Sequence, residues 1–159
     1  MKRETVLITG DKGFIGSHLS KVISHDYNVI GWDLRDDYDI FDSQLEAQIR
    51  GVDAVIHLAA LTNVNSSFKT PGKFFKVNVL GSARVAELCC KYRKKLIYPS
   101  SAAIYHPELS PYAMTKKLAE DIVWGVRDII PIVVLRLYNV FGNDMDPDTG
   151  SLMYNFLTS

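Results

Sequence analysis

The sequence predicts an α/β fold, in which a doubly wound, Rossmann-like parallel sheet forms a single domain over residues 1–159. Apolar runs of strand length alternate along the chain with segments of helical periodicity, which is the pattern of such sheets. Hydrophobic residues make up 47% of the 159 residues, enough to bury the core of one ordinary domain. No internal repeat or low-complexity tract interrupts the alternation. We therefore expect one domain, with no separate C-terminal substrate domain in this chain.

The first unit is a strand, a glycine-rich turn and a helix. Residues 5–8 form an apolar run typical of a short buried strand, and apolar residues recur at helical spacing over residues 14–23. Between them, Gly10, Gly13 and Gly16 are spaced Gly-x-x-Gly-x-x-Gly. Glycines allow a tight turn and the close approach of a pyrophosphate, and the N-terminus of the next helix offers free N–H groups. Taken alone, such a turn can also be purely structural.

A second strand, predicted over residues 29–32, ends at Asp33. This carboxylate follows Gly13 by about twenty positions, the spacing expected of an acid that binds the adenosine ribose of a dinucleotide. The order of strand, glycine turn, helix, strand and acid therefore favours a dinucleotide site over a structural turn.

The next elements are shorter. Residues 34–42 are acidic and leave room for at most a short strand, while residues 43–50 permit a brief helix that ends at Gly51. Residues 54–60 form a continuous apolar run, as expected of a strand covered on both faces. Its C-terminal end should line the same crevice as the glycine turn.

A long helix is predicted over residues 71–92, where a broad apolar face recurs at helical spacing. Asn78 is the polar residue in its apolar middle, and a buried amide must find hydrogen-bond partners. It either ties the helix to the neighbouring loop or reaches the cofactor side, and the spacing alone favours the first role.

The last predicted elements are a strand over residues 95–99, a helix over residues 112–127 and a strand over residues 132–137. Ser110 and Pro111 suit the cap and the first turn of that helix. Its spacing predicts that Leu118, Ile122 and Val126 face inward.

Composition excludes several classes of function. Eighteen basic residues balance eighteen acidic ones, so net charge offers no argument for nucleic acid or an anionic membrane. There is no apolar segment of membrane-spanning length and no leader pattern, so we expect a cytoplasmic protein. Cys89 and Cys90 are adjacent and ill placed for a disulfide with each other, and no Cys/His set has zinc spacing. We expect reduced cysteines and no metal.

A second group of residues carries acid/base chemistry. Tyr112 and Lys116 are four positions apart on one predicted helix and therefore share a face. A tyrosine keeps its proton until about pH 10, but a cation within about 4–6 Å lowers its pKa and makes it a usable base. Ser101, at the end of the preceding strand, could bind the same substrate oxygen. A Tyr-x-x-x-Lys pair also occurs by chance on solvated helices, but its place downstream of a cofactor turn favours a redox site.

Seven motifs occur in one order along the chain. They are Thr9-Gly10-x-x-Gly13-Phe14-Ile15-Gly16, Asp33, His57-Leu58-Ala59-Ala60, Asn78-Val79-x-Gly81, Ser100-Ser101-Ala102-Ala103, Tyr112-x-x-x-Lys116 and Arg136-x-x-Asn139. This ordered set resembles the extended short-chain dehydrogenase/reductases, the nucleotide-sugar epimerases and dehydratases. The resemblance covers nearly the whole chain and is far more specific for the family than for the substrate.

The resemblance implies that NAD is the cofactor. Asp33 would bind the adenosine ribose and disfavour a 2′-phosphate, although Arg35 leaves NADP possible. Asn78 moves toward the cofactor side, Lys116 would contact the nicotinamide ribose and Tyr138 would lie near the nicotinamide. The other cofactor-binding positions that it implies are Gly10, Gly13, Phe14, Ile15 and Gly16 for the pyrophosphate, Asp39 and Ile40 for adenine, and Leu58, Ala59 and Ala60 beneath the cofactor.

The same resemblance implies transient oxidation of a sugar hydroxyl. Tyr112 would be the acid/base, Ser101 would orient the hydroxyl, and Asn139 would lie near the nucleotide-sugar substrate. Dehydratases of the family usually carry an Asp-Glu pair where this chain has Ala102-Ala103, which favours an epimerase. A homodimer is expected through a four-helix contact of the two long helices.

Two features differ from the family pattern. The segment between Ser101 and Tyr112 is short, and the chain stops soon after Gly142, before the segment that would bind the nucleotide of the sugar donor. The cofactor site is therefore nearly whole and the substrate site is not. Two alternatives to an epimerase stay open, namely a non-catalytic dinucleotide-binding module and a compact reductase of a small carbonyl compound.

Overall fold

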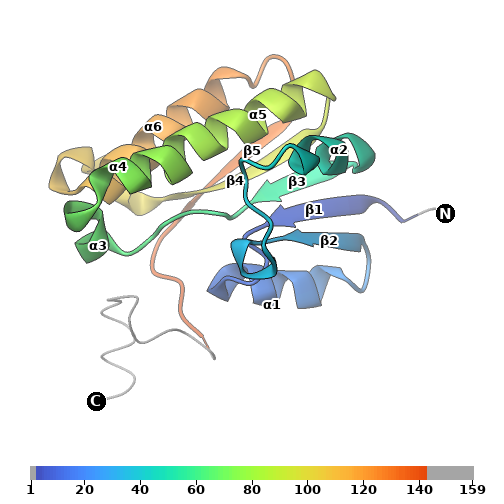
Figure 1. Cartoon of the computed structure of the whole chain (residues 1–159), viewed down its shortest axis with the longest axis horizontal. Coiled ribbons are helices and arrows are strands. Elements are labelled where there is room, and N and C mark those ends of the chain that lie inside the picture. The colour runs from blue at the N-terminus through green and yellow to red at the C-terminus, as the bar shows by residue number, and fades with distance from the viewer. Residues whose placement is uncertain (1–2, 143–159) are drawn as a thin grey trace.

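The computed structural model describes residues 3–142. It confirms the α/β fold, with one sheet of five parallel strands in the order β2-β1-β3-β4-β5 (Figure 1). The strands are β1 (Thr5–Thr9), β2 (Asn28–Trp32), β3 (Ala54–His57), β4 (Lys95–Ser101) and β5 (Ile132–Leu137). The α-helices are α1 (Phe14–Ile23), α2 (Gln44–Gly51), α3 (Val64–Lys69), α4 (Pro71–Phe74), α5 (Gly81–Lys91) and α6 (Pro111–Gly125). A π-helix (Phe75–Leu80) joins α4 to α5, and 3-10 helices span Leu34–Asp36, Ala102–Tyr105 and Pro107–Leu109.

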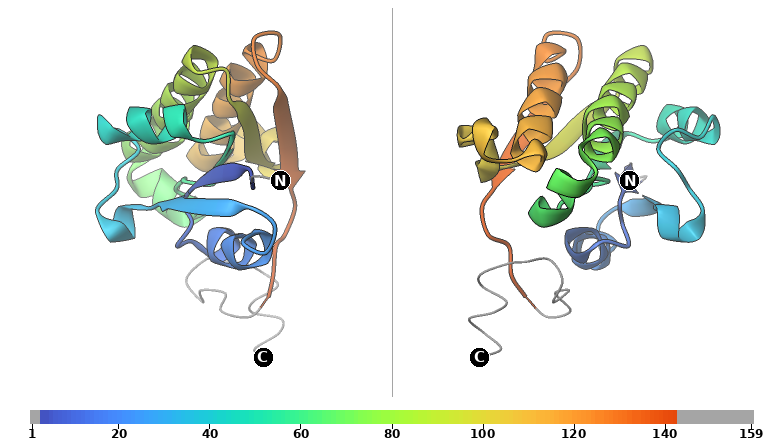
Figure 2. Two further views of the ribbon diagram at one scale, coloured as in Figure 1. Left: turned by 90° about the vertical axis from the view of Figure 1, so that its right-hand side faces the viewer. Right: turned by 60° about the vertical axis from the view of Figure 1, so that its left-hand side comes forward.

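The helices cover the two faces of the sheet unequally. Helices α5 and α6 lie side by side over one face, and α1 lies on the other (Figures 1 and 2). The larger core forms under α2, α5 and α6, where Leu45, Val85 and Val123 are fully buried. A smaller core forms where Leu19 and Ile23 of α1 pack against the opposite face. Burial of these apolar surfaces is the main force that holds the layers together.

Strand order places the candidate site. Strand β1 pairs with β2 on one side and with β3 on the other, so the order of the sheet reverses there. Thr9, at the end of β1, is in register with Trp32 of β2 and His57 of β3. Ligands of doubly wound folds bind outside the carboxyl ends of strands at such a switch point. The glycine turn that follows Thr9 lies at this point.

The inward face of α6 differs from the prediction. Leu118 and Ile122 are 40% and 38% exposed, so the expectation that they face inward is wrong, although Val126 does pack partly buried against the core. The buried face is shifted and carries Lys116 and Glu120 as well as small residues. These two charged side chains are accommodated because each has a hydrogen-bond partner inside, as described below, and hydrophobic periodicity cannot register such partners.

The long helix over residues 71–91 is also less regular than predicted. Its middle is the π-helix Phe75–Leu80, in which each turn holds an extra residue. Two residues of the predicted apolar face, Phe75 and Leu80, are 44% and 48% exposed and so do not belong to the core of the chain.

Some shorter segments also differ from the sequence prediction. Helix α3, capped by the Asn63 side chain, was not predicted. Between β2 and α2 the described chain forms the 3-10 helix Leu34–Asp36 and no strand. Of the predicted single domain over residues 1–159, residues 1–2 and 143–159 lie outside the described part, so its extent stays a prediction. In the described part, no helix is long and apolar enough to cross a membrane.

Candidate functional site

The glycine turn is closely enclosed by backbone. Gly10 has a φ of 77°, a left-handed conformation that favours glycine, and a Cβ there would lie 2.7 Å from the amide nitrogen of Ala59. A Cβ at Gly16 would collide with the carbonyl oxygen of Gly10. Gly13 is the N-cap of α1 and makes no side-chain capping bond, so the first N–H groups of this ten-residue helix face the turn without a side-chain acceptor. The start of α1 therefore has N–H donors without a side-chain acceptor, a feature that anion-binding turns share.

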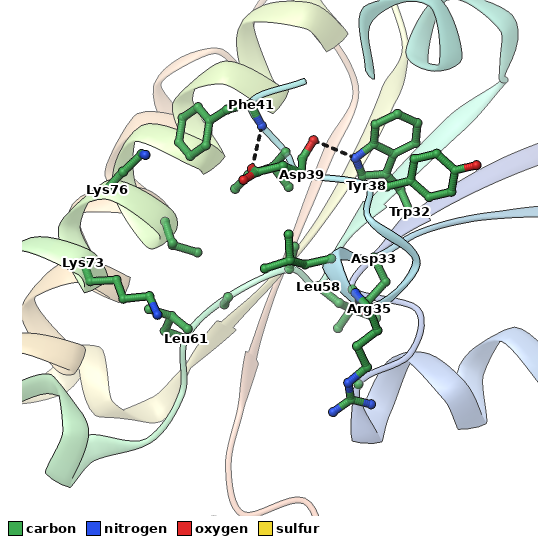
Figure 3. Close-up of a pocket in the computed structure, with 17 residues that line it drawn as sticks. Trp32, Asp33, Arg35, Tyr38, Asp39, Phe41, Leu58, Leu61, Lys73 and Lys76 are labelled. Carbon is green, nitrogen blue, oxygen red and sulfur yellow. Dashed lines mark hydrogen bonds between the residues drawn. The ribbon is translucent and has the colours of Figure 1, made fainter. Parts of the chain in front are cut away.

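A cavity of about 490 Å³ opens beside this turn (Figure 3). It runs between the ends of β1, β2 and β3 and the π-helical segment. Eight of the predicted cofactor residues line it, namely Gly10, Gly13, Asp33, Asp39, Ile40, Leu58, Ala59 and Ala60. The volume and the mixed lining suit a ligand the size of an adenosine with its phosphates.

Asp33 is oriented by main-chain hydrogen bonds. Its carboxylate accepts from the N–H of Arg35 at 2.9 Å and from the N–H of Lys12 at 3.1 Å. The first bond caps the 3-10 helix that follows β2. The Arg35 guanidinium donates in turn to the carbonyl oxygen of Lys12. Asp33 is thus fixed where β2 ends, at the cavity wall, as a ribose-binding acid requires.

The far wall of the cavity is formed by the segment after Tyr38. The Trp32 indole N–H donates to the Asp39 carbonyl oxygen at 3.0 Å, and the Asp39 carboxylate accepts from the Phe41 N–H at 2.9 Å (Figure 3). The Trp32 and Tyr38 rings stack with centroids 4.6 Å apart. These contacts fold the acidic segment back over the cavity and hold Asp39 and its neighbour Ile40 at the wall.

Several lining residues were not predicted. They are Trp32, Leu34, Tyr38, Phe41, Leu61, Lys73, Lys76 and Val77. Trp32 and Tyr38 could have been found from their places beside Asp33 and Asp39. Lys73 of α4 and Lys76 of the π-helical segment reach the cavity because these two segments pack there, and no local sequence signal indicates it.

Asn78 supports the loop beneath the cavity. Its side chain accepts from the Leu61 N–H at 2.8 Å and donates to the Leu61 carbonyl oxygen at 3.0 Å and to Thr115 Oγ1 at 3.2 Å. It is 1% exposed and is not among the described residues that line the cavity. Of the two roles that the sequence left open, this geometry supports the tie between helix and loop.

The acid/base group lies at the end of β4. Ser101 ends this strand, and Tyr112 and Lys116 lie on α6. Burial raises the pKa of Tyr112, and a hydrogen bond with Ser101 acts in the opposite direction. The structure thus brings Ser101 and Tyr112 together, as their predicted roles require. Because burial governs the Tyr112 pKa here, its lowering by Lys116 stays a prediction.

Lys116 is held by β4. It is 5% exposed, and its Nζ donates to the Tyr98 hydroxyl at 3.0 Å and to the Pro99 carbonyl oxygen at 2.8 Å. Burial lowers the pKa of Lys116 to about 8, although the Glu120 carboxylate opposes this shift. The ammonium is therefore accommodated by neutral oxygen acceptors.

The remaining predicted residues lie apart from the cavity wall. Tyr138 is 74% exposed and Asn139 is exposed, both after β5. Neither is among the described residues that line the cavity, and neither are Phe14, Ile15, Gly16, Tyr112 and Lys116. Glu120, one turn beyond Lys116, pairs with Arg136 of β5 at 2.7 Å. The cavity thus collects the residues predicted to bind adenosine and phosphate, and the roles of all the predicted site residues stay predictions.

The fold and the turn define a dinucleotide-binding α/β protein, and comparison with known proteins identifies its family. The model of the "NAD dependent epimerase/dehydratase family" matches residues 6–158. The chain therefore belongs to this family, which agrees with the resemblance drawn from the sequence motifs and with the NAD cofactor that they imply.

Two curated relatives and one solved structure illustrate the similarity. A "Putative UDP-glucose 4-epimerase" of Methanocaldococcus jannaschii is 33% identical over 89% of this chain and 58% of its own length. A "dTDP-D-glucose 4,6-dehydratase" of Dictyostelium discoideum is 31% identical over 91% of this chain and 46% of its own. The structure "MoeE5 in complex with UDP-glucose and NAD" aligns with a TM-score of 0.82 and 29% identity over 91% of this chain and 57% of that one. The chain thus spans about half the length of these proteins.

Proposed function

We propose that the chain binds NAD and acts as a nucleotide-sugar epimerase, by transient oxidation of a sugar hydroxyl. The observation that carries this proposal is the glycine turn, which opens into the same cavity as Asp33. The acid/base group of Ser101, Tyr112 and Lys116 follows on the same carboxyl side of the sheet.

The chain's residues fit the cofactor. The turn keeps its close backbone packing because Gly10 and Gly16 have no side chains, and a pyrophosphate would bind at the start of α1, whose N–H groups would donate to it. Asp33 would accept hydrogen bonds from the adenosine ribose, and Asp39 with Ile40 would bound the adenine. Lys116 would reach the nicotinamide ribose, with Tyr138 near the nicotinamide.

Bound NAD supplies the hydride acceptor, and later the donor, of the reaction. The chain's own residues move the proton. Tyr112, as phenolate, takes the proton of the sugar hydroxyl at its Oη and returns it after the ketone has been reduced on its other face. Because burial disfavours this phenolate, it requires positive charge nearby. We assign that charge to the ammonium of Lys116, one turn further along α6. Ser101 holds the reacting hydroxyl.

The choice of an epimerase rests on Ala102 and Ala103. An acid pair at these positions would serve the elimination that a dehydratase performs, and two alanines cannot move a proton. The curated relatives include one protein of each name, so similarity alone does not decide between them.

We also propose that the protein forms a homodimer through its two long helices. Leu80 on the π-helical segment and Met114, Leu118 and Ile122 on α6 are 38–52% exposed. Large apolar side chains that cluster on the surface of one layer are normally covered by a partner. A second copy of the chain would cover them and complete a four-helix contact.

The experiment that tests the enzyme proposal combines binding and turnover. NAD binding is measured by calorimetry, and UDP-glucose is then incubated with the loaded chain and followed by NMR for C4 epimerisation. We expect both NAD binding and turnover, and loss of turnover with retained binding in Tyr112→Phe.

A non-catalytic dinucleotide-binding module is the second candidate, because Tyr112 and Lys116 are not among the described residues that line the cavity. It predicts NAD binding with no turnover of any UDP-sugar. Reduction of a small carbonyl compound by NADH, without epimerisation, would instead support a compact reductase.

A further inference from the structure

Buried polar groups form a hydrogen-bonded series between the sheet and α5. The Ala59 N–H donates to Thr9 Oγ1 at 3.3 Å, and Thr9 Oγ1 lies 2.7 Å from His57 Nδ1. His57 Nε2 lies 3.1 Å from Ser82 Oγ, and Ser82 donates to the Asn78 carbonyl oxygen at 2.6 Å. Thr9, His57 and Ser82 are each at most 2% exposed. Water does not compete for these bonds, so the direction of each donor is determined inside the protein.

The direction of donation follows from Ser82. Its single proton is used by the Asn78 carbonyl, so its oxygen can only accept from other neighbours. His57 therefore carries its proton on Nε2. Tyr98 also forms a hydrogen bond with Ser82, and its hydroxyl oxygen accepts one from Lys116.

Lys116 donates a hydrogen bond to the Tyr98 hydroxyl oxygen. Its Nζ lies 3.0 Å from the Tyr98 oxygen, 4.4 Å from the centre of the Tyr98 ring and 2.8 Å from the Pro99 carbonyl oxygen. An ammonium has three N–H groups, and β4 accepts two of them. These contacts fix the position of the amine, whose four-carbon stem would otherwise be free to rotate.

We propose that Tyr98 is a positioning residue for Lys116: its hydroxyl, hydrogen-bonded to Ser82, holds the ammonium in place on the helix face that carries Tyr112. The inference rests on the proposed function, because Lys116 serves Tyr112 only if the chain performs acid/base chemistry. It adds a residue of β4 that touches neither the substrate nor the cofactor and acts through Lys116.

The charges around Lys116 support this role. The titratable groups that contact Lys116 or interact with its charge are Tyr98 from β4, His57 from β3 and Glu120 from α6, and Tyr112 lies one helical turn before it. Burial, followed by the charge of Lys116, lowers the pKa of His57 to about 3, and burial raises the pKa of Tyr98. Near neutral pH both are uncharged. The Tyr98 oxygen is thus a dipolar acceptor that favours the charged form of Lys116, and its removal favours the neutral amine.

The test is a titration of Lys116 in the 159-residue chain carrying ¹³C-labelled lysine. The Cε signal of Lys116, assigned by its loss in Lys116→Arg, is followed by NMR from pH 6 to 11. In Tyr98→Phe we expect the pKa of Lys116 to fall by about one unit, the size of a lost hydrogen bond to a charged group. Where turnover is measured, the high-pH limb of kcat should move down by the same amount.

Tyr92→Phe is the matched control. It removes a hydroxyl that donates to Glu46 Oε1 at 2.6 Å, away from α6, and should leave the Lys116 titration unchanged. If Tyr98→Phe does not fold, Ser82→Ala decides, since it keeps the Tyr98 hydroxyl but removes its hydrogen-bond partner Ser82. We expect a smaller downward shift there.

An unchanged Lys116 pKa in Tyr98→Phe overturns the inference. If Tyr98→Phe does not fold, an unchanged Lys116 pKa in Ser82→Ala does so. This readout is independent of turnover. Failure to bind NAD or to epimerise a UDP-sugar would overturn the proposed function while leaving the measured shift intact.

Discussion

Replacement of Gly10 by alanine tests the geometry of the turn. The backbone at Gly10 has a φ of 77°, which costs an L-residue about 1–2 kcal/mol. The new Cβ would also lie 2.7 Å from the Ala59 nitrogen and 2.9 Å from the Ala59 Cα, both backbone atoms that cannot rotate away. Overpacking of this kind costs about 1–3 kcal/mol. We therefore expect Gly10→Ala to lower the free energy of unfolding by roughly 2–5 kcal/mol and the Tm by roughly 5–15 °C.

The assay is thermal unfolding with calorimetric titration of NAD on the folded variant. Because the loop at Ala59 lines the cavity and must shift to admit the methyl group, we expect NAD affinity to fall at least tenfold, or about 1.4 kcal/mol. Gly72→Ala is the control, since a Cβ there meets no atom within 4 Å. Its Tm should stay equal or rise slightly, as alanine favours a helix. If Gly10→Ala melted within a degree of the wild type and bound NAD equally well, the described turn geometry would be refuted.

Three further predictions concern support, pH and assembly. Asn78→Ala should destabilise the chain by about 1–3 kcal/mol in urea unfolding, because the Leu61 N–H and carbonyl lose their buried partner; an unchanged midpoint would contradict the tie between helix and loop. His57 has a pKa of about 3 when folded against an ordinary 6.5, so the unfolded chain binds the extra proton and stability falls as pH drops from about 6.5 toward 3. That loss is on the order of 3–5 kcal/mol when complete, and a His57→Gln variant with the same pH dependence would exclude His57 as its cause. Leu118→Glu should halve the native particle mass measured by light scattering without lowering the Tm, because this side chain is 40% exposed within one chain. A dimer that survives this change would place the interface elsewhere.

The parts of the site that the sequence predicts are those with a local cause. Gly10, Gly13 and Gly16 are constrained by the turn itself, and Asp33 follows its strand directly, so spacing alone indicates both. The cavity brings Gly10, Gly13 and Asp33 together as expected, whereas Gly16 does not line it. The same holds for Ser101 and Tyr112, which lie at adjacent element ends.

The parts that the sequence does not predict depend on contacts between distant segments. Lys116 and Glu120 can be buried because each has a partner on a strand beneath α6. The Tyr98 hydroxyl of β4 accepts from Lys116, and Arg136 of β5 pairs with Glu120. Hydrophobic periodicity alone treats both charged residues as solvent-facing. This displaced Leu118 and Ile122 from the expected core to the outer surface. The π-helix over Phe75–Leu80 is likewise not predicted, because the apolar pattern over these residues does not distinguish it from an α-helix.

The most direct measurement is a calorimetric titration of NAD into the 159-residue chain and its Asp33→Ala variant. We predict that the chain binds one NAD. The Asp33→Ala variant should bind it about 10–100-fold more weakly, because it lacks the carboxylate proposed to hydrogen-bond the ribose. Circular dichroism should show that both are equally folded. Absence of binding to the folded chain, or equal affinity for the variant, would contradict the assignment of this cavity to the adenosine half of NAD.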